Sequence, residues 1–228
     1  MHSTKNNLHV LHEDNHLMII NKRAGDIVQG DKTGDKPLSE VVKEYIKDKY
    51  NKPGAVYLGT VHRLDRPTSG IVIYAKTSKA LERLNKMLRD KVIKKTYWAV
   101  VKDQPKKSED TLINFLKKNP KNNKSTAYPK EIDGSKKAIL HYKTLKNLDN
   151  YSLLEIDLET GRHHQIRVQL SNIGAIIKGD LKYGARRSNK DGSIHLHARN
   201  IDFIHPVSKE RIKITAPTPK DPIWDACL

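Results

Sequence analysis

The chain has 228 residues and a formal net charge of +17, from 43 basic and 26 acidic side chains. This length predicts one domain, residues 1–228, with its own core, and the charge favours a polyanionic partner, nucleic acid before an anionic membrane surface. The single cysteine, Cys227, excludes an intrachain disulfide and is typical of a reducing compartment. Neither a signal-peptide core nor a run of about twenty apolar residues occurs, so we expect a cytoplasmic protein.

The N-terminal segment predicts two strands and then a helix. The apolar runs 8–11 and 17–21 flank a short acidic turn, as in a β-hairpin, and the basic turn 21–25, NKRAG, closes the second strand. From residue 38 to 46, apolar residues return every three or four positions. This spacing predicts an amphipathic helix that ends at the segment 51–54.

The central stretch, residues 62–70, reads HRLDRPTSG and leads directly into an apolar strand over 71–75. Its carboxylate, Asp65, lies between two arginines. Pro67 cannot donate to a strand ladder and Gly70 permits unusual backbone angles, so we expect a loop of fixed shape. A carboxylate held there could serve as a nucleophile, or it could be a salt-bridged turn residue.

The middle of the chain predicts one helix and several strands. Thr77 or Ser78 can cap a helix with a basic outer face, and residues 94–101 are strand-like, with Tyr97 either filling the core or stacking on a base. The lysine-rich stretch 102–146 predicts short edge strands and loops on a basic surface. Further strands are expected at 138–142 and 151–158.

The second informative stretch, residues 159–170, reads ETGRHHQIRVQL. We expect Gly161 to permit the break between a strand and a helix with a buried stripe from His164 onward. Backbone amides at the start of this helix, together with Arg162, could engage a phosphate. After it, the sequence predicts strands at 175–177, 194–198, 201–204 and 211–216, and an irregular proline-containing tail.

Several separated motifs resemble the RluA family of RNA pseudouridine synthases. They are the turn Asn21-Lys22, the loop 62–70, Lys95-x-Tyr97, the segment 161–167, and the later segments 179–184 and 196–198. The resemblance implies a mixed α/β (α+β) fold, with a largely antiparallel central sheet flanked by helices and the catalytic cleft across its middle. It also implies isomerisation of uridine in ribosomal or transfer RNA.

By this resemblance, Asp65 is the catalytic carboxylate, Tyr97 stacks on the target uracil and Arg167 pairs with Asp65. The residues expected to contact RNA are Lys22, Arg63, Arg66, Lys95, Arg162, His164 and Gln165. Many relatives carry threonine at the position of His163 and histidine at that of Gln169. The chain begins almost at once with the catalytic domain, so we expect no separate N-terminal RNA-binding domain.

The isomerisation gains and loses no atoms, so we expect no cofactor and no metal. It requires a carboxylate near the nucleotide, a cation that keeps it ionised and a flat apolar surface for the detached uracil. The sequence leaves open whether Asp65 attacks the sugar, attacks the base or removes a sugar proton. The uridine must leave its stack, at a cost of a few kcal/mol in structured RNA.

Two other functions compete with this one. A metal-dependent hydrolase could use histidines, since His195 and His197 can lie on one face of a strand. The other candidates for such a site are His62, His163 and His164. The His-Glu-x-x-His spacing at residues 12–16 falls in the predicted turn between two strands rather than on a helix, so it does not favour such a site. A noncatalytic RNA-binding protein would explain the charge equally well, but it would not need a carboxylate in a basic groove.

Overall fold

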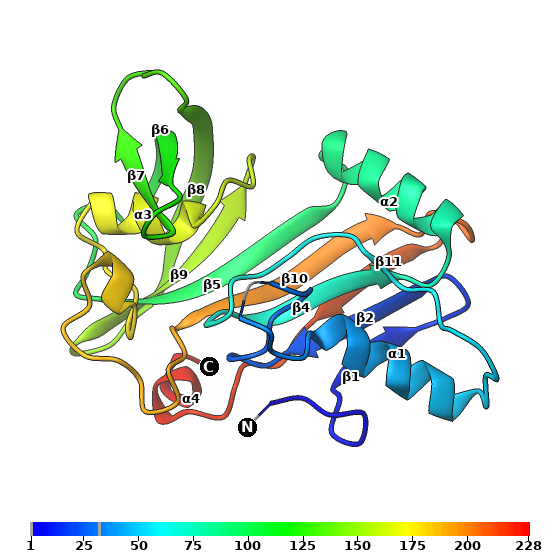
Figure 1. The fold of residues 1–228 in the computed structure, drawn as a ribbon. Helices are drawn as coiled ribbons and strands as arrows, with labels where there is room; N and C mark the ends of the chain where they lie inside the picture. The colour runs from blue at the N-terminus through cyan, green and yellow to red at the C-terminus, as the bar shows by residue number, and fades with distance from the viewer. Residues whose placement is uncertain (1, 32) are drawn as a thin grey trace. The chain divides into compact units, whose positions relative to one another are not determined.

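The computed structural model describes residues 2–31 and 33–228. Its fold is mixed α and β, with a large, mostly antiparallel sheet and few helices, which confirms the predicted fold class (Figure 1). The chain forms two compact units. The first unit comprises Met1–Lys94 and Ala198–Pro219, and the second comprises Lys95–His197 and Lys220–Leu228. The expectation of a single domain over 1–228 stays a prediction.

In the described part of the chain, the first unit contains five strands and part of a sixth. They are β1 (Val10–Glu13), β2 (Leu17–Lys22), β3 (Gly59–Thr60), β4 (Ser69–Ala75), β11 (Arg211–Thr215) and the part of β10 (Leu196–Ile204) from Ala198 on. β2 pairs with β1 and β4, as the predicted hairpin requires. The two strands expected at 194–198 and 201–204 are one strand, because no glycine or proline separates them and the ladder with β11 includes Asn200.

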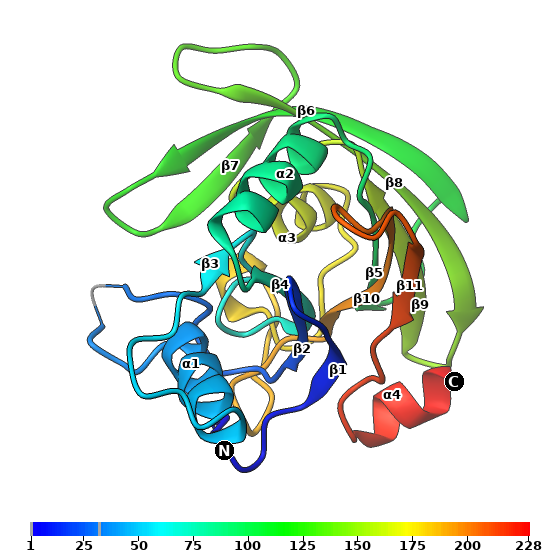
Figure 2. The same ribbon diagram turned by 90° about the vertical axis from the view of Figure 1, so that its right-hand side faces the viewer.

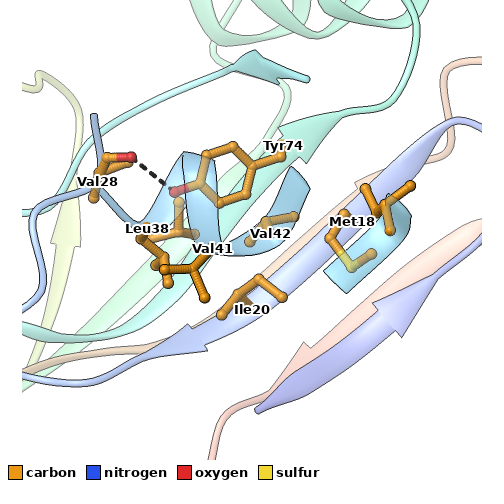
Figure 3. Close-up of a cluster of buried hydrophobic side chains, with 9 residues drawn as sticks. Met18, Ile20, Val28, Leu38, Val41, Val42 and Tyr74 are labelled. Carbon is orange, nitrogen blue, oxygen red and sulfur yellow. Dashed lines mark hydrogen bonds between the residues drawn. The ribbon is translucent and has the colours of Figure 1, made fainter. Parts of the chain in front are cut away.

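Two helices complete the first unit, α1 (Leu38–Lys49) and α2 (Ser78–Arg89). The Thr77 side chain caps α2 by accepting a hydrogen bond from the backbone N–H of Ala80, as predicted. The apolar stripe of α1 packs on β2 and β4 to form a buried cluster (Figure 3). In this cluster the Tyr74 hydroxyl donates to the Val28 carbonyl over 3.0 Å, so its one polar atom is satisfied.

The second unit contains β5 from Lys95 on and four further strands. β5 is Lys94–Lys102, and the others are β6 (Glu109–Asn119), β7 (Lys124–Tyr128), β8 (Lys136–Asn147) and β9 (Tyr151–Leu158). They pair antiparallel in the order β5-β9-β8-β6-β7. Figure 2 shows β6, β7 and β8 as neighbouring strands of this sheet.

The prediction of short edge strands across 102–146 is confirmed only for β7, which has five residues and comes last in the strand order, and it was wrong for β6 and β8. β6 has 11 residues and β8 has 12, and each has a neighbour on both sides. The buried residues Leu112 and Leu116 on β6, and Leu140 and Tyr142 on β8, lie an even number of positions apart. These positions share one sheet face, and the lysines that flank them at residues 117–118, 136–137 and 143 concealed the period of two.

The helices of the second unit are α3 (Gln165–Asn172), the 3-10 helix η1 (Leu181–Tyr183) and α4 (Pro222–Cys227). The strand predicted at 175–177 is only an isolated bridge between Ile177 and Val101. The predicted irregular tail is instead α4, because Pro222 suits a first helical position and the Asp221 side chain caps the helix.

The C-terminal cluster, as we call it, holds α4 against the sheet of the second unit. Its buried members are Val100, Leu153, Trp224 and Cys227, and Trp98 packs against them. Trp224 also stacks on His195, with ring centroids 5.2 Å apart. No helix in the described part of the chain is long and apolar enough to cross a membrane.

Candidate active site

The loop that carries Asp65 is closed by main-chain hydrogen bonds within the first unit. The Thr68 backbone N–H donates to the Asp65 carbonyl over 3.0 Å, which makes a tight turn. The next carbonyl, that of Arg66, accepts from the Gly25 backbone N–H at 2.8 Å and from the Lys22 ammonium at 3.1 Å. The turn after β2 and the loop before β4, two separate sequence motifs, are therefore joined at Arg66.

Lys22 is a buried lysine beneath this loop, with only 1% of its surface exposed. Its ammonium also donates to the Arg23 carbonyl over 2.8 Å. Burial lowers the pKa of Lys22 to about 7, although the charges of Asp26 and Asp65 act to raise it. These contacts give Lys22 a role in positioning the loop, while its predicted contact with RNA stays a prediction.

Gly70 fixes the end of the loop where β4 begins. Its φ is +112°, and a Cβ there would lie 2.5 Å from the backbone nitrogen of Ala198 on β10, and closer still to its carbonyl oxygen. No side chain larger than hydrogen fits without moving the backbone. The prediction that Gly70 permits a special conformation is confirmed, and a neighbouring strand supplies a second reason for it.

The charged residues around Asp65 differ in exposure. Asp65 is half-buried and Arg63 is exposed. The Arg66 guanidinium forms an ion pair with Asp35 at 2.7 Å and donates to the Thr33 hydroxyl at 2.9 Å. His62 accepts a hydrogen bond from the Ile73 backbone N–H through its Nε2 atom at 3.2 Å, so its ring also helps to hold the loop against β4.

β5 carries the two predicted site residues Lys95 and Tyr97 at the start of the second unit. Tyr97 is 7% exposed and lies opposite Ile156 of β9 in the antiparallel ladder. Lys95 is half-buried, and burial lowers its pKa. A ring on a regular strand, with an apolar neighbour beside it, has the fixed orientation that stacking on a base requires.

The segment 161–167 is held mainly by Gln165. This side chain accepts from the Arg162 backbone N–H at 2.9 Å and donates to the Ile139 carbonyl at 3.0 Å. The Arg162 side chain is exposed and donates to the Lys137 carbonyl at 3.0 Å. The predicted RNA contacts of Arg162, Gln165 and the neighbouring His164 stay predictions.

Gly161 lies between β9 and α3, where the break was expected, and the residue with left-handed backbone at the start of the helix is His164, whose φ is 54°. His164 can adopt this conformation because contacts hold its ring on two sides. The ring stacks on His163 at 3.8 Å between centroids, and Nδ1 lies 2.9 Å from the Tyr183 hydroxyl.

Arg167 is 5% exposed and forms a bidentate ion pair with a carboxylate that the sequence analysis gave no role. Its Nε and one terminal nitrogen donate to the two oxygens of Asp180 over 2.7 and 2.8 Å. The guanidinium also lies 5.1 Å from the centre of the Tyr183 ring. Asp180 and Tyr183 belong to the segment 179–184, which is one of the segments that resemble the RluA family. This resemblance was the signal in the sequence that could have identified them.

The two positions that depart from the resemblance both make structural contacts. The hydroxyl oxygen of Ser125 on β7 lies 2.8 Å from Nδ1 of His163. Gln169 is fully buried and donates to the Leu112 carbonyl at 3.1 Å and to the Asn114 side chain at 2.9 Å. Both residues therefore connect α3 to the strands of the second unit.

Within each unit the structure brings several predicted site residues together. Lys22, Asp65 and Arg66 meet in the first unit, and His164 and Arg167 meet around Tyr183 in the second. The predicted pairing of Asp65 with Arg167, beneath Tyr97, stays a prediction. Over residues 2–31 and 33–228, no group of three or more His, Cys, Asp or Glu side chains could hold a metal ion.

Comparison with known proteins identifies the family. The family model described as RNA pseudouridylate synthase matches residues 16–172. The chain belongs to this family. The predicted RluA-type resemblance is confirmed, and with it the enzyme class, an isomerase that acts on uridine in RNA. This result favours the synthase over both the metal-dependent hydrolase and the noncatalytic binding protein.

Individual relatives agree with the family match. An RNA pseudouridine synthase of Synechocystis is 36% identical over 93% of this chain and 66% of its own length. Ribosomal large subunit pseudouridine synthase D of Zymomonas mobilis is 33% identical over 94% of this chain and 70% of its own. The chain thus spans about two thirds of these relatives. The structure of human RNA pseudouridylate synthase domain containing 4 shares the fold, with a TM-score of 0.78 at 22% identity, over 96% of this chain and 91% of that one.

Proposed function

We propose that this chain converts uridine to pseudouridine in ribosomal RNA, with Asp65 as the catalytic carboxylate. The observation that carries the proposal is the construction of the loop around Asp65. Lys22 and Gly25 fix the Arg66 carbonyl, and Gly70 fixes the end of the loop, whereas the Asp65 side chain stays half-exposed. A rigid loop that presents a partly exposed carboxylate suits chemistry on a bound nucleotide.

The reaction breaks the bond between the ribose C1′ and the base N1 and forms a bond between C1′ and C5 of the same uracil. The proton leaves C5 and N1 gains one, so atoms and electrons balance without an added reactant. In this proposal the Arg167 guanidinium keeps Asp65 ionised, and the Tyr97 ring holds the detached uracil by stacking. The remaining predicted cations hold the phosphates of the extruded nucleotide.

Ribosomal RNA is preferred to transfer RNA as the substrate because relatives at 33% and 34% identity are named ribosomal large subunit pseudouridine synthases D and C. The two names also support a cytoplasmic location, where ribosomes assemble. We propose RNA as the partner of this chain, with no membrane and no obligate protein partner.

The replacement Asp65→Asn tests the assignment, because it keeps the size of the side chain and removes its charge. We expect a loss of product formation of about 1000-fold or more, with RNA affinity within about threefold of the original. Pseudouridine in a transcript of large-subunit ribosomal RNA, measured by mass spectrometry of nucleosides, reports the activity. Asp48→Asn is a matched control, since Asp48 is an exposed carboxylate of the same unit.

The same assay separates catalysis from simple binding. Product formation at the normal rate by the Asp65→Asn variant would show that another group carries the reaction. A purified, original chain that binds RNA but makes no pseudouridine in ribosomal RNA from a strain lacking the gene would instead favour the noncatalytic binding protein.

A further inference from the structure

The hairpin between β6 and β7 is the most strongly basic part of the second unit. Residues 111–130 contain five lysines and no acidic side chain. Four of these lysines, which we call the hairpin lysines, lie at its end and are exposed: Lys117, Lys118, Lys121 and Lys124. None of them forms an ion pair within the described part of the chain. Their charges are thus available to an external anion.

The turn of the hairpin has a defined conformation. Asn119 and Lys124 form the closing pair of the ladder, and the Asn119 side chain accepts from the Lys121 backbone N–H at 2.9 Å. The Lys182 ammonium donates to the carbonyls of Asn122 and Asn123 over 3.4 and 3.2 Å. These bonds hold the turn at a fixed position on the second unit and add a fifth cation to it.

The base of the hairpin is bound to the motif that contains Arg167. Ser125, which is 2% exposed, donates through its hydroxyl to the His163 carbonyl and through its backbone N–H to the Tyr183 hydroxyl, at 2.9 and 2.8 Å. The Tyr183 ring lies 5.2 Å from the Lys124 ammonium and 5.1 Å from the Arg167 guanidinium. The hairpin lysines are therefore fixed relative to Arg167.

Acidic side chains of the same sheet lie away from the turn of the hairpin, with Glu109 and Asp110 at the opposite end of β6 and others on β9. Glu155 and Asp157 are on β9, which β8 and β6 separate from β7 in the strand order. On β9 they face Lys143 and His141 of β8 across the ladder. This segregation means that a polyanion approaching the second unit is attracted to the hairpin and repelled from β9.

We propose that the hairpin 117–124 is an RNA-binding arm that holds phosphate groups of the substrate and reads no base. This inference rests on the proposed function, because it assumes an RNA substrate. Lysine is a flexible point charge that suits phosphate contacts, and no buried donor or exposed aromatic ring at the turn would recognise a base. The arm adds affinity and leaves the chemistry to the catalytic residues.

The test removes three charges at once, with Lys117→Gln, Lys118→Gln and Lys121→Gln combined. The control combines Lys47→Gln, Lys52→Gln and Lys213→Gln, three exposed lysines of the first unit, so both variants lose the same net charge. Binding is measured in the Asp65→Asn background against two probes, a large-subunit ribosomal RNA transcript and poly(A), at several salt concentrations. Circular dichroism checks that both variants fold.

Because each lost phosphate contact reduces the salt slope by about 0.7 to 0.9, we expect the slope of the hairpin variant to fall by roughly 2 to 3. Affinity at about 0.1 M salt should fall roughly 100-fold for both probes, and the control should change less than threefold. With Asp65 present, KM should rise and kcat should stay the same. Equal affinities of the two variants for RNA would contradict the proposal that the hairpin binds RNA. A loss of affinity for the transcript alone would contradict the proposal that the hairpin reads no base.

The binding and activity readouts separate the two proposals. If the original chain makes no pseudouridine but the hairpin variant loses affinity for poly(A), the proposed function fails and the arm stands. If the original chain makes pseudouridine and the hairpin variant binds RNA as tightly as the control, only the proposal of an RNA-binding arm is rejected.

Discussion

The two motif loops, 62–70 in the first unit and 161–167 in the second, fix their shapes by different means. In the first, a glycine with φ of +112° lies against the backbone of a neighbouring strand. In the second, Gly161 has open space around it, and a histidine adopts the left-handed conformation. The first loop is thus constrained by close backbone packing, and the second by the side-chain contacts of His164, Gln165 and Arg167.

The difference shows that a glycine in a motif loop need not be the residue that adopts the unusual backbone conformation. Gly70 and Gly161 look equivalent in sequence, since each ends or begins a polar stretch beside a regular element. Only Gly70 has a positive φ and lies against the backbone of Ala198, and these two features make it irreplaceable. The second loop depends instead on buried polar contacts, which substitutions of charge disturb more than substitutions of size.

The strongest test of this comparison is Gly70→Ala against Gly161→Ala. We expect Gly70→Ala to lower the free energy of unfolding by about 4 kcal/mol, because strain at positive φ and the clash with Ala198 add. Gly161→Ala should change it by less than about 0.5 kcal/mol. Urea denaturation followed by circular dichroism measures both, and equal effects would mean that the two glycines have the same role after all.

A second test concerns the buried charges of the second loop. Asp180→Asn removes the buried carboxylate of the bidentate pair with Arg167 and should destabilise the chain by about 3 kcal/mol. Asp202→Asn is the matched control, since Asp202 forms a pair of similar geometry with Arg211, whose side chain is 67% exposed. It should cost less than about 1 kcal/mol. Equal losses in thermal or urea unfolding would contradict the importance of burial.

A third test concerns a pH dependence from Lys22 beneath the first loop. Its pKa is about 7 in the folded chain and 10.5 as the ordinary value, so the unfolded chain binds more protons between these limits. Stability should therefore rise with pH across this window, by up to about 1.4 kcal/mol per unit, relative to Lys22→Met. Below pH 7 the difference between the two proteins should be constant.

Urea unfolding at pH 6, 7.5 and 9 measures this difference, with the exposed Lys52→Met as the control. A difference that does not change with pH would mean that Lys22 keeps its proton in the folded chain, and that the first loop also depends on a buried charge.

The sequence predicted the elements with clear periodicity and missed those that depend on distant partners. The helices at Leu38 and Ser78 follow from apolar spacing and a cap, and the position of Asp65 before a buried strand follows from local chemistry. The length of β6 and β8 was missed because lysines flank their buried residues, at 117–118 on β6 and at 136–137 and 143 on β8. Asp180 received no role because a partner 13 residues away in sequence is fixed only by the fold.

Both tryptophans of the chain, Trp98 and Trp224, belong to the C-terminal cluster of the second unit. Intrinsic fluorescence therefore monitors that unit, whereas circular dichroism records helices and strands of both. For Gly70→Ala, in the first unit, the two signals carry separate information. Coincident transitions would indicate that the halves melt as one cooperative body, and a fluorescence midpoint left unchanged would reveal that each half unfolds independently.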